Sequence, residues 1–153
     1  MKIDIVDKVH YIDLQKKREL KEKVALILKN LSLPKKTEIC ISLVDDDTMR
    51  SLNETYRGIK RTTDVLSFPQ YEENLTNPSK TNFILGDILI SINTAIKNSK
   101  RYQNSLEQEV QKLLIHGILH LLGYDHKKIK EAQKMREKEK ELMNLIQPYQ
   151  QVE

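Results

Sequence analysis

Alternating polar and apolar residues predict β-strands, because a half-buried strand presents every second side chain to the core. The alternation is clear at 2–6 and 37–44, and residues 62–68 form a shorter β-rich run. Residues 83–91 are nearly all apolar, which is typical of a central strand covered on both faces. Gly86 within that run indicates a β-bulge or the close approach of another backbone. The pattern therefore predicts four strands.

Helical spacing of apolar residues predicts five helices, and local capping signals mark their ends. Asp13 is the expected N-cap of the first helix, and Ser105 and Gln108 have the capping-box form at the start of the fourth. The acidic run 45–47 favours a helix N-terminus over a metal site, and Gly58 ends the helix that follows it. The helices are expected to run from 13 to about 30, from 48 to 57, from 94 to the region 99–104, from 105 to 122 and from 128 to 146.

Residues 69–82 are predicted to form a loop, since they are polar, contain two prolines and lack periodicity. The order strand, helix, strand, helix, strand, loop, strand and then three helices predicts an α+β fold, with helices packed on a small mixed sheet. No repeat or change of composition divides the chain, so residues 1–153 are expected to form a single domain.

The chain has 153 residues, of which 39% are hydrophobic, and this is enough for a buried core without disulfides. No apolar run approaches the roughly 20 residues that span a bilayer, and the charged N-terminus lacks the apolar stretch of a signal peptide. We therefore expect a cytoplasmic protein with no membrane partner. The single cysteine, Cys40, is expected to be an unreactive core residue.

The formal net charge is +4, which is compatible with a polyanionic partner but does not indicate one by itself. The charged run 134–141 in the last helix is expected to be a solvated face with ion pairs between successive turns. Leu14 and Ile129 are expected to belong to the buried stripes of the first and last helices.

Three of the four histidines lie between 116 and 126. His116 and His120 are about one helical turn apart, so both imidazoles project from the same face. Gly123 can adopt a positive φ and turn the chain back, so that His126 returns to the same point. Three imidazoles with an open coordination position are the ligand set of many catalytic zinc sites. The spacing predicts a metal site, with zinc favoured over other divalent ions, at the end of a core helix.

The same spacing, H-x-x-x-H-x-x-G-x-x-H, occurs in metzincin peptidases, where a glutamate after the first histidine is the general base. Here Gly117 occupies that position, and Met135 and Met143 lie in the last predicted helix, not in a Met-turn. A metallopeptidase is therefore an alternative, but the site is expected to serve a different reaction.

Three segments resemble motifs of the YbeY family, the bacterial rRNA-maturation endoribonucleases. HGILHLLGYDH at 116–126 matches the signature H-G-x-L-H-L-x-G-Y-D-H without departure. LNETYRGIKRTTDVLSFP at 52–69 and LGDILIS at 85–91 are similar to two further family segments and follow the family's order. The resemblance covers essentially the whole chain and implies a mixed four-stranded sheet surrounded by helices.

The resemblance also implies a function. The implied activity is single-strand-specific endoribonuclease action in 16S rRNA 3′-end maturation and ribosome quality control, with the small ribosomal subunit as partner. His116, His120 and His126 are the implied zinc ligands, and His116 and Arg57 the implied catalytic residues.

The chemistry of the remaining candidates agrees with an RNA substrate. The planar guanidinium group of Arg57 can donate two hydrogen bonds to a phosphate. Lys60 and Arg61 add positive charge nearby that could bind the RNA backbone. Asp125 has two open interpretations, because it could orient a ligand histidine or cap the turn. Asp64 is undecided, and no residue is identified as the general acid.

A second class of function also stays open. In that alternative, the protein is a ribosome-assembly binding factor whose metal is structural. Chelation distinguishes the two hypotheses, because removing a structural ion would unfold the C-terminal region, whereas removing a catalytic ion would leave a folded, inactive protein. The sequence does not indicate the oligomeric state.

Overall fold

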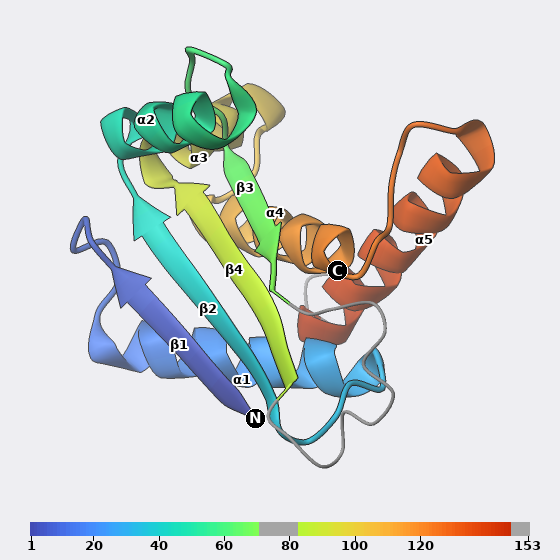
Figure 1. Ribbon diagram of the computed structural model, residues 1–153. Coiled ribbons are helices and arrows are strands. Elements are labelled where there is room, and N and C mark those ends of the chain that lie inside the picture. Colours follow the sequence, from blue (N-terminus) through green and yellow to red (C-terminus); the bar gives the residue numbers. More distant parts are fainter. Residues whose placement is uncertain (71–82, 148–153) are drawn as a thin grey trace.

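The computed structural model describes residues 1–70 and 83–147, which form a four-stranded sheet and five helices (Figure 1). Most of the predicted loop, residues 71–82, lies outside the described residues. The elements in chain order are β1 (Lys2–Asp7), α1 (Leu14–Asn30), β2 (Thr37–Val44), α2 (Asp46–Arg57), β3 (Val65–Pro69), β4 (Phe83–Ser91), α3 (Ile92–Tyr102), α4 (Leu106–Leu121) and α5 (Ile129–Ile146).

The sheet has the strand order β1-β2-β4-β3, in which β1, β2 and β4 are parallel and β3 is antiparallel at one edge. This mixed sheet confirms the predicted α+β class. The predicted irregularity at Gly86 is also confirmed, since the register between β2 and β4 shifts beside Glu38 and Ile39. Gly86 has a φ of 152°, and a Cβ there would lie 2.3 Å from the carbonyl oxygen of Phe68. Only glycine allows β3 and β4 to approach so closely.

The main core lies between one face of the sheet and the helices α1 and α4, with α5 packed on both helices (Figure 1). Its fully buried side chains include Ile41 and Ile88 from the strands and Leu114 from α4. The opposite face is covered at its carboxyl end by α2, where Met49 packs with a small cluster from the strands.

The two faces of the sheet are covered unequally, and two predictions from the sequence are therefore wrong. Residues 83–91 are not buried on both faces, because Asp87 and Leu89 are only half-buried on the side that α2 covers incompletely. Cys40 lies on that same side and is half-buried, so it is not a core residue. Burial nevertheless raises the pKa of the Cys40 thiol, which agrees with the expected lack of reactivity.

The capping signals are confirmed. The Asp13 carboxylate accepts a hydrogen bond from the Lys16 N–H at 2.8 Å, and Ser105 and Gln108 form the complete capping box. Gly58 ends α2 in the left-handed conformation, with a φ of 68°.

Three element starts were predicted wrongly, and one of them is α2, which begins at Asp46, not 48, because Asp45 is its N-cap. β3 begins at Val65, not 62, and the hydroxyl of Thr62 donates to the Asp46 carboxylate at the start of α2. α3 begins two residues earlier than expected, because Ser91 acts as its N-cap and accepts from the Thr94 N–H.

Two residues that were expected in the buried stripes are exposed, each at the start of its helix. Leu14 and Ile129 are 67% and 85% exposed, because each is the first residue of its helix and lies before the turns that reach the core. The first turn of α5 projects past α4 (Figure 1). None of the described helices has the length and apolar character needed to cross a membrane.

Candidate metal centre

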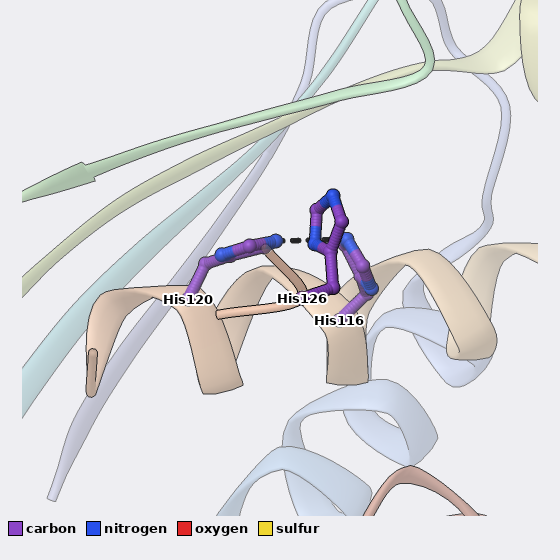
Figure 2. A group of neighbouring side chains, drawn as sticks. All are labelled: His116, His120 and His126. Carbon is purple, nitrogen blue, oxygen red and sulfur yellow. Dashed lines mark hydrogen bonds between the residues drawn. The ribbon is translucent and has the colours of Figure 1, made fainter. Parts of the chain in front are cut away.

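The last turns of α4 and the bend that follows bring the three predicted histidines together (Figure 2). His116 and His120 project from the same face of α4. The N–H groups of Gly123 and Tyr124 then donate to carbonyls of the last helical turn at 3.0 Å. Gly123 adopts a φ of 91°, which reverses the chain direction and returns His126 to the other two rings.

The geometry of the three rings fits one metal ion. Nε2 of His116 and Nε2 of His120 are 3.0 Å apart, and the candidate ligand nitrogens of all three rings lie within 4.8 Å of one another. Tetrahedral zinc with Zn–N bonds of about 2.0–2.1 Å would hold its nitrogens roughly 3.3 Å apart. Two rings are half-buried and that of His126 is exposed, so one side of the group stays accessible.

Burial favours the neutral form of the His120 imidazole. Burial lowers the pKa of His120 below its ordinary 6.5, and the charges of His116 and His126 would lower the pKa further. A neutral imidazole has the free lone pair that a metal ion requires. The three imidazoles can therefore hold a metal ion.

Glu139 on α5 completes the group and was missed in the sequence. Its Oε2 lies 3.0 Å from Nδ1 of His116, on the side of the ring away from His120. The expectation that residues 134–141 form a solvated face is therefore wrong for Glu139, which is half-buried. A signal was present, since Glu139 lies four residues after Met135 and three before Leu142, both of which are buried.

A cavity of about 780 Å³ opens beside the imidazoles, and we call it the site cavity. Its walls come from the end of α2, from β3 and from the bend after α4. Arg57, the last residue of α2, lines this cavity together with all three histidines, and Lys127 adds a second cation. Lys60 and Arg61 are exposed but are not among the lining residues, because the chain turns away after α2 ends.

Two acidic side chains also line the site cavity. Oδ1 of Asp125 accepts a hydrogen bond from the His126 backbone N–H at 2.7 Å, which is the turn-capping contact of the two considered for it. The carboxylate of Asp64 accepts from the Asn98 side chain at 3.2 Å.

Gly117, which stands where metzincins have their general base, faces the sheet. The Ser67 hydroxyl donates to the Gly117 carbonyl at 3.2 Å, and a Cβ on Gly117 would lie 3.0 Å from Cγ2 of Ile88. Any side chain larger than hydrogen would therefore press on Ile88 and Ser67. This packing disfavours the peptidase alternative.

Comparison with known proteins gives the family. The family model for Endoribonuclease YbeY matches residues 2–147. The chain belongs to the YbeY family. The matched range contains every residue that lines the site cavity, and Glu139 as well.

Individual members of the YbeY family are also similar to this chain over most of its length. The Endoribonuclease YbeY of Thermoanaerobacter sp. (strain X514) is 42% identical over 146 residues, which is 90% of each chain. That of Aquifex aeolicus is 42% identical over 139 residues, covering 88% of this chain and 87% of the relative. A Thermotoga maritima protein with a known solution structure aligns with a TM-score of 0.65 at 31% identity, over 94% of this chain and 88% of that chain.

Proposed function

We propose that the protein is a metal-dependent endoribonuclease that cuts single-stranded RNA in the cytoplasm. The observation that carries the proposal is that Arg57 and three imidazoles able to hold a metal ion line one cavity. Membership of a family described as Endoribonuclease YbeY supports RNA as the substrate. The specific role proposed is 16S rRNA 3′-end maturation and ribosome quality control, with the small ribosomal subunit as partner and one domain containing the whole site.

The metal proposed is a single zinc ion held by His116, His120 and His126, where it would supply Lewis acidity beside a bound phosphate. The Glu139 carboxylate accepts a hydrogen bond from the Nδ1–H of His116, which leaves Nε2 of that neutral ring unprotonated and facing His120. The carboxylate therefore fixes both the tautomer and the orientation of His116.

Arg57 is the proposed phosphate-binding residue. Its guanidinium is always charged and can donate two parallel hydrogen bonds to phosphate oxygens, which would stabilise charge that develops during cleavage. Lys127 lines the same cavity and contributes a second positive charge. Lys60 and Arg61 lie outside the site cavity, so their proposed contacts are to backbone phosphates further along the strand.

A cleavage assay on a precursor transcript tests the proposal. The wild-type protein with zinc is expected to cut the RNA, and His116→Ala and Arg57→Ala are each expected to reduce the rate by roughly a hundredfold or more. Arg57→Ala should keep its fold and its metal, since Arg57 is an exposed helix-end residue. Arg50→Ala is the matched control on α2, because Arg50 pairs with Asp47 at 2.6 Å and is not among the cavity-lining residues.

Intact RNA after incubation with metal-loaded wild-type protein would contradict the nuclease proposal. RNA binding without cleavage would favour the ribosome-assembly factor instead. The ends of the products identify the nucleophile, since a cyclic phosphate requires attack by the RNA 2′-OH.

A further inference from the structure

The rim of the site cavity carries an exposed aromatic side chain. Tyr56 is 64% exposed, lies in the last turn of α2 next to Arg57 and lines the site cavity with the histidines. A single exposed aromatic residue is ordinary on a protein surface. Here its position matters, because the same cavity is lined by the cations that would bind RNA phosphates and by the imidazoles that could hold a metal ion.

A second aromatic ring supports Tyr56. The ring centroids of Tyr56 and Phe68 are 5.1 Å apart, with the ring planes tilted by 58°. Phe68 comes from β3, is half-buried and packs on the small cluster under α2 that contains Met49 and Leu66. The Phe68 ring is thus anchored to the fold, and it restrains the more exposed ring of Tyr56.

We infer that Tyr56 and Phe68 form a stacking site for one unpaired nucleobase of the RNA whose phosphate Arg57 binds. The inference rests on the proposed function and adds the substrate feature that the cavity recognises. Base stacking on aromatic rings tolerates any sequence, because every base has a π-face. In a duplex those faces are covered by neighbouring base pairs, so only a single strand can use the site.

The charges around the aromatic pair favour a nucleotide over an apolar peptide. Arg57 and Lys127 line the same cavity, so a strand with phosphates on both sides of its base meets positive charge there. Tyr56 and Arg57 are consecutive residues, which places a base-binding ring beside a phosphate-binding group.

Binding of a short unstructured RNA by metal-free protein tests the inference without cleavage. The readout is the Kd of a fluorescently labelled oligonucleotide, measured by anisotropy in chelator. Tyr56→Ala and Tyr56→Leu are expected to weaken binding roughly tenfold, whereas Tyr56→Phe should bind like the wild type because it keeps the ring. Tyr102→Ala is the control, since Tyr102 is 54% exposed on α3 and is not among the residues lining the site cavity.

Removal of the bases separates stacking from a general loss of affinity. An oligonucleotide of the same length built from abasic sugar-phosphate units should bind equally to wild type and Tyr56→Ala. A blunt RNA duplex should also bind equally to both. A loss that is the same for all three ligands would overturn the inference, because it would show that Tyr56 acts on the backbone or on the fold.

The failure of this inference is distinguishable from failure of the proposed function. If the metal-loaded wild type cleaves RNA but Tyr56→Ala binds the single strand with unchanged Kd, the stacking site is wrong and the nuclease stands. If the wild type neither binds nor cleaves RNA, both are wrong.

Discussion

Glu139 would act on a bound metal ion through His116, because its carboxylate bonds to the ring nitrogen that faces away from His120. Carboxylates in this position orient a ligand histidine and raise its basicity. Asp125, which the sequence offered for the same task, instead holds the bend by accepting from the His126 N–H.

Replacement of Glu139 by Gln is expected to weaken metal binding about 10- to 100-fold while the fold is kept. The amide is neutral and holds the Nδ1 proton of His116 less strongly. Competition between the protein and a chelator of known affinity measures the change. Cleavage should fall at limiting metal and recover in excess metal, since the ligands themselves remain.

The matched control for that prediction is Glu141→Gln. Glu141 lies on the same helix and carries the same charge, but it pairs with Lys138 at 2.6 Å. The metal affinity of the Glu141→Gln variant should equal that of the wild type. Equal effects of the two substitutions would show that Glu139 acts only through net charge.

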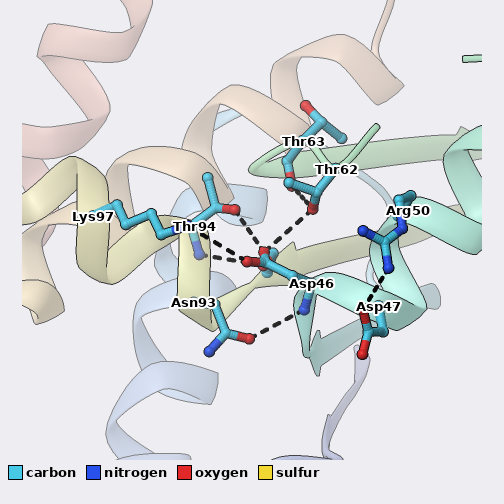
Figure 3. A network of polar contacts seen from close by, with 9 residues as sticks. Asp46, Asp47, Arg50, Thr62, Thr63, Asn93, Thr94 and Lys97 are labelled. Atoms are coloured by element: carbon cyan, nitrogen blue, oxygen red, sulfur yellow. Dashed lines mark hydrogen bonds and ion pairs between the residues drawn. The ribbon is translucent and has the colours of Figure 1, made fainter. Parts of the chain in front are cut away.

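At the scale of elements, Asp46 connects α2, α3 and the segment before β3 (Figure 3). Its Oδ1 accepts from the hydroxyls of Ser91 at 2.6 Å, Thr94 at 2.7 Å and Thr62 at 3.2 Å. These bonds fix the start of α2 against the end of β4. Arg57 lies at the other end of the same helix, so the network helps to hold the helix that carries Arg57.

The network makes stability depend on pH in a defined direction. Burial alone would raise the pKa of Asp46, but the bonds from Ser91, Thr94 and Thr62 and the charge of Lys97 outweigh it and lower the pKa below 3.8. The folded protein therefore favours the carboxylate. Its contribution is fully present above the ordinary pKa and is lost as pH falls through the lower, folded-state value.

We expect Asp46→Asn to reduce the free energy of unfolding by about 1–2 kcal/mol near neutral pH. The difference from the wild type should shrink as pH falls below 3.8, because the wild-type group then becomes protonated as well. Urea unfolding at several pH values measures this. Asp47→Asn, on an exposed neighbour paired only with Arg50 among the contacts described, should change stability by less than about 0.5 kcal/mol at every pH.

On the scale of the whole molecule, the sequence predicted what depends on local spacing. The strands, the helix caps and the imidazole trio each arise within a few residues of chain. Arg57 lines the same cavity as the trio because the end of α2, β3 and α4 meet there, and no local pattern encodes that arrangement. Lys60 and Arg61 come only three and four residues after Arg57, yet they are not among the residues that line the site cavity, because the chain turns at Gly58. The contact of Glu139 runs from α5 to α4, so the spacing from Met135 and Leu142 indicated its burial but not its partner, His116.

Removal of the metal is expected to leave the fold intact. The other side of α4 is buried against the sheet, with Leu114 and Ile118 fully buried, so the core does not depend on the ion. Chelated protein should keep its helical circular dichroism and unfold cooperatively at a lower Tm. Free metal at a hundredfold excess over its Kd should add about 2.7 kcal/mol of stability. Loss of helix on chelation would instead indicate a structural metal.

The close packing at Gly117 limits which side chains could replace the glycine. The hydrogen that serves as its side chain lets α4 rest directly on β3 and β4. A glutamate there would complete the motif H-E-x-x-H-x-x-G-x-x-H, but its Cβ alone would lie 3.0 Å from Cγ2 of Ile88 and 3.1 Å from Oγ of Ser67, so these side chains would have to shift. A substitution at Gly117 is therefore expected to disturb the packing of α4 on the sheet before it could supply a general base.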